Sequence, residues 1–160
     1  MRKDFYVGRF DRNGLEMLSG EECLALLANN DFGRIGLSIN ALPAILPVNY
    51  KMVDGVVVIL SAGGAKVAAA ANHSVVAFEV DKVSPSGEYG WSVLAIGVAF
   101  RVEDEPELLA RLNGPMEVWI DIKAATLIGI RPDIISGRKI EGPRHRKVFG
   151  ADSALATRLG

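Results

Sequence analysis

The dipeptide Asp54-Gly55, set between two runs of strand-forming residues, narrows the possible folds more than any other feature of the chain. Both residue types tolerate the positive φ of a two-residue hairpin turn, so residues 44–52 and 56–61 are predicted to pair as antiparallel strands. Residues 33–39 alternate in polarity, and a turn signal at residues 40–43 follows them. The first half of the chain is therefore expected to contain a three-stranded antiparallel meander.

Three later segments also have strand composition, with the turn-rich loop 81–90 between the first two as a candidate wall of a site. They are residues 74–80, 91–102 and 125–130. Gly97 interrupts the longest of them and predicts a bulge or a close approach of another backbone. Since no βαβ unit repeats, a mainly β (α+β) fold is predicted, with the strands in a closed or split antiparallel barrel.

Short helices are expected to cover this barrel. Ser19 and Glu22 form the S-x-x-E pattern of a capping box, and apolar residues recur at helical spacing as far as residues 29–30. The alanine-rich run at residues 65–71 predicts a second helix, which ends near Asn72. A third helix is predicted from Glu105, where proline and acidic residues open the first turn.

The composition excludes several classes of protein. The 160 residues suit one domain, and 49% of them are hydrophobic, which is enough for a sizeable core. With a net charge of -1, the chain carries no basic footprint for nucleic acid. The mean hydropathy of +0.23 is high for a lone soluble domain, so part of the apolar surface is expected to be covered in a homodimer.

The reactive residue types give no sign of a metal or hydrolytic site. Cys23 is the single cysteine and is expected to be a buried core thiol, while His73 and His145 lack a metal-ligand spacing. His73 follows the alanine-rich helix and is interpreted as a residue of the helix end. The sequence shows neither a signal peptide nor a membrane-spanning segment, so a cytoplasmic protein is expected.

The strand-to-helix turn at residues 61–66 is the sharpest candidate for chemistry. It comprises Ser61, Ala62, Gly63, Gly64, Ala65 and Lys66. The glycines let an anion approach the main chain, Lys66 adds a positive charge, and Ser61 can donate a hydroxyl group, so a phosphate is the expected ligand. The alternative is an ordinary turn with a solvated lysine, because the P-loop spacing is absent.

Two further segments could hold a planar ring. Pro47 lies inside a predicted strand, which implies an edge or bulged position, followed by Val48, Asn49 and Tyr50. Asn49 offers a donor and an acceptor to a heterocycle, and Tyr50 can stack or hydrogen-bond; ordinary barrel packing is the alternative. Trp91 and Ser92 begin the longest strand and could lie beside a cofactor or in a dimer interface.

Taken together, these segments resemble the pyridoxamine 5'-phosphate oxidase-like, FMN-binding split-barrel family, especially its nitroimidazole-reductase-like and flavin/deazaflavin oxidoreductase branches. The resemblance covers about residues 17–140. It is carried, in order, by residues 18–27, 33–36, 42–50, 64–66, 76–81, 90–93 and 136–138.

The resemblance implies an antiparallel six-stranded Greek-key split β-barrel and a homodimer with two FMN sites at the subunit interface. Residues 47–50 would line the isoalloxazine ring, and Ser61, Gly64 and Lys66, with Ala62 and Ala65 in the same turn, would approach the phosphate. Trp91 and Ser92 would come from the partner subunit. The implied domains are an N-terminal extension at residues 1–16, the barrel at residues 17–140 and a C-terminal tail at residues 141–160.

The chain departs from many relatives at Leu60, Ala65 and Ile96, where the relatives carry polar or basic residues. The expected anion site therefore has few side chains that could bind a phosphate. The predicted function is an FMN-dependent oxidoreductase acting on a small organic molecule, with no general base assigned. The alternatives are a deazaflavin-dependent reductase and a non-catalytic flavin- or haem-binding protein, with haem through His73 ranked last. Neither a nucleic acid nor a membrane is expected as a partner.

Overall fold

The computed structural model describes residues 10–114, 116 and 125–142, and within them the chain is mainly β. The strands are β1 (Glu16–Leu18), β2 (Phe32–Ile39), β3 (Leu42–Val53), β4 (Val56–Ser61), β5 (Val75–Val83), β6 (Tyr89–Arg101) and β7 (Thr126–Glu141). The helices are α1 (Gly20–Ala28), α2 (Ala65–Ala71) and α3 (Pro106–Arg111), with a 3-10 turn η1 (Val102–Asp104) before α3. Among these, no helix is both long and apolar enough to cross a bilayer.

Six of the strands form a closed antiparallel ring in the order β7-β4-β3-β2-β5-β6, because β6 also pairs with β7. The chain runs through the β2–β3–β4 meander, then crosses over through α2 so that β5 returns to pair with β2, which is a Greek-key connection. The predicted six-stranded antiparallel barrel with short covering helices is confirmed. β1 is an additional seventh strand, which pairs with the end of β7.

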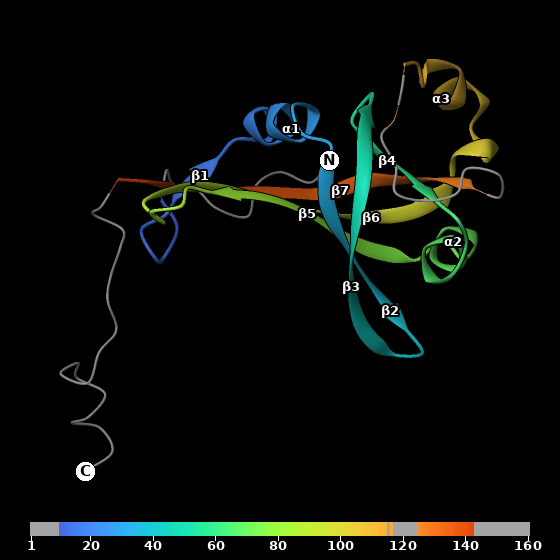
Figure 1. Cartoon of the computed structure of the whole chain (residues 1–160), viewed down its shortest axis with the longest axis horizontal. Helices are drawn as coiled ribbons and strands as arrows, with labels where there is room; N and C mark the ends of the chain where they lie inside the picture. The colour runs from blue at the N-terminus through green and yellow to red at the C-terminus, as the bar shows by residue number, and fades with distance from the viewer. Residues whose placement is uncertain (1–9, 115, 117–124, 143–160) are drawn as a thin grey trace, which may run out of the picture.

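The meander follows the turn chemistry of the sequence. Asn40 and Ala41 link β2 to β3, and Asp54 and Gly55 link β3 to β4, all four with positive φ. Positive φ at both central residues is the signature of the hairpin turn whose twist matches that of its strands. In Figure 1 the β2–β3 hairpin extends away from the body of the molecule, while α2 and α3 lie toward the opposite end of the long axis from β1.

β7 is much longer than the strand predicted at residues 125–130. It pairs with β6 from Arg101↔Ile128 as far as Tyr89↔Glu141. Pro132 normally argues against a central strand, but here it lies opposite Gly97, where the register shifts and the ladder is interrupted. The predicted end of the strand was therefore wrong.

Two apolar clusters fill the structure. The larger one occupies the barrel interior and includes Cys23 and Leu27 of α1, both fully buried, so the predicted core role of the Cys23 thiol is confirmed. The smaller one lies under α3 and includes Val58, Phe100 and Leu108. The two clusters together hold the helices against the sheet.

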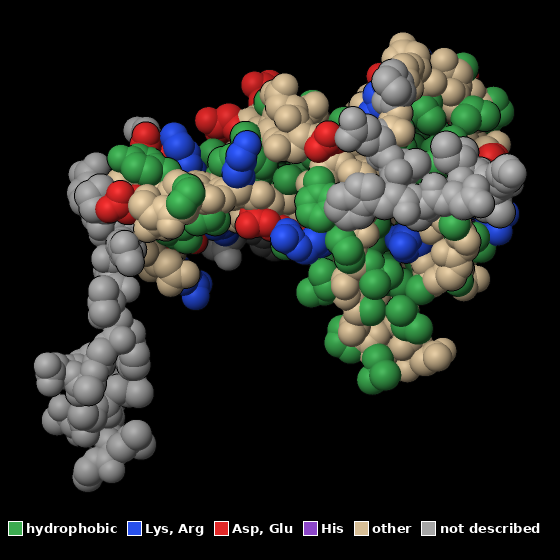
Figure 2. Space-filling model, in the orientation of Figure 1, with side chains coloured by type: hydrophobic (Ala, Val, Ile, Leu, Met, Phe, Trp, Pro, Cys, Tyr) green, Lys and Arg blue, Asp and Glu red, His purple; other side chains and the backbone are tan. Residues whose placement is uncertain are grey.

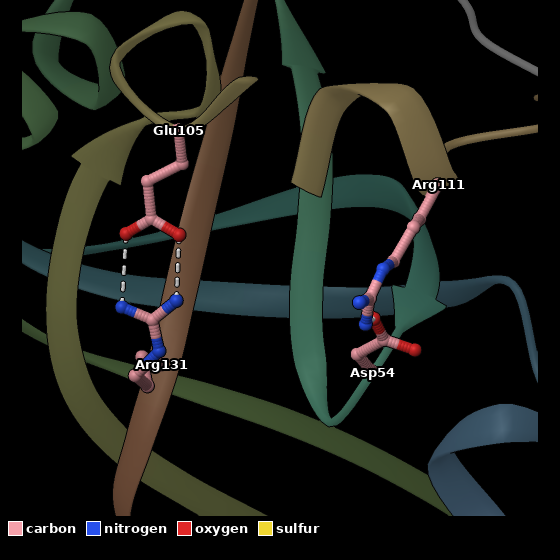
Figure 3. Close-up of polar contacts among 4 residues, drawn as sticks. All are labelled: Asp54, Glu105, Arg111 and Arg131. Atoms are coloured by element: carbon pink, nitrogen blue, oxygen red, sulfur yellow. Dashed lines mark hydrogen bonds and ion pairs between the residues drawn. The ribbon is translucent and has the colours of Figure 1, made fainter. Parts of the chain in front are cut away.

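Polar contacts fasten the α3 segment over this smaller cluster (Figure 3). Glu105 accepts two hydrogen bonds from the Arg131 guanidinium, at 3.0 and 2.7 Å, and the guanidinium carbon lies 4.9 Å from the centroid of the Phe100 ring. Arg111 of α3 forms an ion pair with Asp54 in the β3–β4 turn. Arg111, Asp54 and Arg131 are exposed and Glu105 is half-buried, so these contacts orient α3 more than they stabilise it.

Gly97 allows the sheet to close. A Cβ atom at this position would lie 1.9 Å from the Arg131 carbonyl oxygen, and the register shifts between Ile96 and Gly97. Both the bulge and the close approach predicted at this glycine are confirmed. No other residue type fits without moving the backbone of β7.

Substitution Gly97→Ala is expected to lower the free energy of unfolding by about 3 kcal/mol, because β6 and β7 must separate to admit the methyl group. Gly36→Ala is the matched control, since its Cβ would meet the Ala77 Cβ at an ordinary 3.5 Å. Chemical denaturation of both variants measures the difference, and equal effects would contradict the close-approach argument.

Candidate functional site

The turn between β4 and α2 has the geometry of an exposed backbone loop. Gly63 and Gly64 adopt φ of 106° and 78°, in the left-handed region that favours glycine, and both are exposed. The Ser61 hydroxyl is buried and donates to the Gly63 carbonyl at 3.1 Å. Ser61 therefore shapes the turn, and the glycine main chain is the part of it that solvent reaches.

Lys66 is the cation of this turn. It lies in the first turn of α2 and is half-buried, as is Ala65, whereas Ala62 is exposed. Within the described residues, the Lys66 ammonium forms no ion pair with a carboxylate. An anion at the glycine main chain would therefore find a lysine that no described carboxylate neutralises.

The segment around Pro47 is at the edge of the barrel wall. β3 pairs with β4 only through Tyr50–Val53, whereas residues 42–49 pair with β2 alone, Pro47 opposite Arg34. The edge position predicted from the proline is confirmed. The pairing of β3 with β4 ends at Tyr50↔Ile59. Residues 47–49 of β3 and the turn after Ser61 of β4 therefore separate from each other at this pair.

Alternation along β3 gives these residues opposite roles. Val48 and Tyr50 point inward and are 6% and 2% exposed, while Pro47 and Asn49 point to the outer face of the sheet. The Tyr50 hydroxyl donates to the Leu27 carbonyl at 2.6 Å, and its ring meets Phe78 edge-on. The side chains of Val48 and Tyr50 are thus core residues in this structure, and Asn49 keeps the side chain that can reach a ring edge.

Burial raises the pKa of Tyr50 well above its usual range, with the nearby Asp31 carboxylate as a smaller cause. The phenol therefore stays protonated and keeps its hydrogen bond to α1 throughout the neutral range. Its role is to tie the first helix to β3.

Trp91 and Ser92 are neighbours on β6 and so point to opposite faces of the sheet. The Trp91 indole packs against the barrel core and lines a pocket beneath α1. Ser92 pairs with Asp81 of β5 and shares the outer face with Asn49. Since β2 and β5 lie between β3 and β6, the strands that carry Asn49 and Ser92 are about 14 Å apart within one chain.

The outer face of this sheet is unusually apolar. One cross-strand row runs from β3 to β7 through residues directly opposite one another: Ile45, Gly36, Ala77, Ile96 and Ile134. Ile45 is 73% exposed, and Leu42 at the tip of the same hairpin is 70% exposed. Figure 2 shows the projecting hairpin covered mainly by hydrophobic side chains.

A small charge cluster lies beside this row and was not anticipated from the sequence. Arg34 contacts Glu79 at 3.2 Å and Asp81 at 2.7 Å, so one guanidinium serves two carboxylates. Partial burial, and then the charge of Asp81, raise the pKa of the Glu79 carboxyl. The sequence does contain a signal for this cluster. Glu79 and Asp81 are two residues apart on one strand, so their side chains point to the same face of the sheet.

These features identify the relatives of the chain. A sequence model of the pyridoxamine 5'-phosphate oxidase family matches residues 19–139, which run from just before α1 to two residues before the end of β7. The chain belongs to the pyridoxamine 5'-phosphate oxidase family.

Individual relatives match this chain in sequence or in fold. The uncharacterized protein Rv0080 of Mycobacterium tuberculosis is 39% identical over 128 residues, covering 77% of this chain and 84% of the relative. A FAD-binding protein from Mycobacterium smegmatis is 29% identical with a TM-score of 0.62, covering 78% of this chain and 97% of that one. A Corynebacterium glutamicum protein provisionally described as a pyridoxamine 5'-phosphate oxidase is 26% identical with a TM-score of 0.65, covering 79% and 93%.

Replacing Tyr50 by phenylalanine is expected to cost about 1 kcal/mol of unfolding free energy at neutral pH, because the hydrogen bond to α1 is lost. The folded pKa lies above the unfolded value of 10.0, so this contribution is present below pH 10 and is lost as the pH rises further. Wild-type stability should therefore fall more steeply above pH 10 than that of Tyr50→Phe. Urea titrations from pH 7 to 11 measure this, with the exposed Tyr89→Phe as the control; parallel pH profiles would exclude it.

Proposed function

We propose that this protein is a flavin-dependent oxidoreductase that binds FMN or a related flavin and acts on a small organic molecule. The observation that carries the proposal is Lys66, which pairs with no carboxylate of the described residues and lies beside the exposed main chain of Gly63 and Gly64, at the point where β3 and β4 separate. Family membership and the FAD-binding relative at 29% identity support the same class of ligand.

The residues fit such a ligand in two parts. Main-chain N–H groups of Gly63 and Gly64, with the Lys66 ammonium, would hold the phosphate. The β3 edge would lie along the ring, where Pro47 leaves the ladder open and Asn49 offers both a donor and an acceptor. A bound flavin supplies hydride or electron transfer itself, and the chain orients it. No general base is assigned.

The proposed anion site has few polar or charged side chains, and this affects which cofactor the protein can bind. Leu60 and Ala65 bring no charge or hydroxyl to the turn, and each charge-assisted hydrogen bond is worth about 1.5 to 3 kcal/mol. A deazaflavin cofactor is therefore the main alternative. A non-catalytic flavin-binding protein is the second, and turnover with a nicotinamide or reduced deazaflavin donor would argue against it. Haem ranks last, since His73 is exposed at a positive φ where α2 ends.

A homodimer is part of the proposal, because one chain holds only half of the predicted site. Two strands separate Ser92 from Asn49 within a chain, which supports a second copy as the source of Ser92 at the ring. The apolar outer face and the projecting β2–β3 hairpin provide the surface for that copy, since a two-stranded hairpin with exposed apolar residues is unstable in water. The expected cytoplasmic location belongs to the same proposal.

Lys66→Gln is expected to raise the dissociation constant of FMN at least tenfold, because one charge-assisted hydrogen bond to the phosphate is lost. Arg12→Gln removes the same charge from an exposed position near β1 and should leave the affinity unchanged. Flavin fluorescence titration measures both. A wild-type protein that neither retains nor binds any flavin would overturn the proposed function.

Ile45→Glu is expected to convert the dimer to a monomer and to abolish flavin binding with it, since the charge would be buried at the subunit contact. Leu109→Glu places the same charge on exposed α3, away from the outer face, and should change neither property. Sedimentation velocity and flavin titration of both variants are the measurements. A wild-type monomer that binds flavin would refute the shared site.

A further inference from the structure

A pocket of about 320 Å³ lies between α1 and the ends of β6 and β7, on the face of the sheet opposite Ser92. Its wall is mostly apolar, and the half-buried indole of Trp91 forms part of it. The lining residues are Leu18, Glu22, Ala25, Leu26, Asn29, Trp91 and Lys139. The contacts proposed for the flavin leave this pocket unused.

The described part of the chain ends beside the pocket. Lys139 lines it from β7, and that strand ends two residues later at Glu141. Gly142 follows with a positive φ of 81°, which takes the chain out of the strand direction. Residues 143–160 therefore start about 10 Å from Lys139, which is three residues along an extended strand.

The length and sequence of the segment after Gly142 suit the pocket. Residues 143–160 contain neither tryptophan nor tyrosine and a single phenylalanine, Phe149. The seven residues from Gly142 to Phe149 span at most about 23 Å when extended, which exceeds the distance back to Lys139. An aromatic ring is the expected partner for a partly exposed indole, since ring pairs gain more than their buried area alone.

The N-terminal residues 1–9 also contain aromatic side chains but enter the structure farther away. β1 pairs with β7 through Glu16↔Lys139, and Phe10 pairs with Glu16 from the other side. Residues 1–9 thus join the sheet one strand farther from the β7 wall of the pocket than residues 143–160 do.

Charge also favours the C-terminal segment. α1 begins with the exposed Glu21 and Glu22, and Glu22 lines the pocket. The Lys139 ammonium forms an ion pair with Glu141 at 3.3 Å, so it opposes an approaching cation only weakly. Residues 143–150 include no acidic residue and three basic ones, Arg144, Arg146 and Lys147. The basic segment and the acidic start of the helix are therefore complementary.

We propose that residues 143–150 of the same chain occupy this pocket, with the Phe149 ring against the Trp91 indole and the basic residues toward the start of α1. The contact joins the end of β7 to α1 and removes the exposed part of the indole from water. It does not rest on the proposed flavin function.

Quenching of Trp91 fluorescence by acrylamide tests the occupant in the whole chain without added flavin. In a Trp119→Phe background Trp91 is the remaining tryptophan. Phe149→Ala should raise the quenching constant about twofold, because no second ring shields the indole. Leu155→Ala removes an apolar side chain farther along the same segment and should leave the constant unchanged. No change in Phe149→Ala would overturn the inference, as would a rise in Phe5→Ala, which would assign the pocket to the N-terminal residues.

Cysteine cross-linking tests the position of the segment. Ala25→Cys combined with Phe149→Cys should form an intrachain disulfide on mild oxidation, since a disulfide requires Cα atoms within about 7 Å of each other. Ala28→Cys with Phe149→Cys is the matched control, because Ala28 is exposed on the same helix and does not line the pocket, and it should cross-link more slowly. Cys23 is fully buried and should not compete. Peptide mapping by mass spectrometry measures both rates; equal rates, or a disulfide between two copies, would overturn the inference.

Discussion

The pairing of β7 with both β4 and β6 is the constraint on which the rest of the structure depends. Without it the sheet remains open, and the core loses one wall. The closure relies on places where a Cβ atom does not fit, and two of them show how. One is Gly97, against the Arg131 backbone, and the other is Gly137, where a Cβ would lie 2.7 Å from the Cys23 sulfur. The first glycine brings β6 onto β7, and the second seats α1 on the closed sheet.

The same closure positions the candidate site. β4 stays with β7 as far as Ser61↔Thr126, while the outer part of β3 follows β2. The two strands are thus held by different neighbours once they pass Tyr50 and Ile59. As a result, β4 leads into the turn that carries Lys66, and the outer part of β3 has a free edge that carries Asn49. Hydrogen bonds to β7 hold β4 in place, and hydrogen bonds to β2 hold β3. A ligand bound between them would meet a preorganised main chain, which lowers the cost of binding.

Much of this architecture could be predicted because local chemistry and the global fold agree. Asp54-Gly55, the Ser19–Glu22 capping box and the proline at position 47 each led to the structure that is found. The full length of β7 could not be predicted, since Pro132 is tolerated only because the register shifts beside it, opposite Gly97 of a strand that is distant in sequence. β1 is three residues long and is a strand only through its pairing with β7.

The segments that form the candidate site could be predicted from the sequence, but the directions in which their side chains point could not. Residue types at 47–50 and 91–92 suggest contact with a ring, yet alternation assigns them to two faces. Which face is interior follows from the ring order, and that order depends on long-range pairing. Tyr50 has the chemistry of a ligand-stacking residue and instead donates to the Leu27 carbonyl. Tertiary position decides between the two roles.

The distribution of polar groups also bears on how a family of this fold changes cofactor. In the proposed site the turn after β4 would offer an anion main-chain groups and one lysine, so most of its binding capacity would not depend on side-chain identity. The absence of polar side chains at Leu60 and Ala65 would weaken the phosphate end without removing it. Selectivity would then come from surfaces that contact other parts of the ligand. The outer face would be such a surface, and it is built by β6 and its neighbours, which the closure by β7 holds in register.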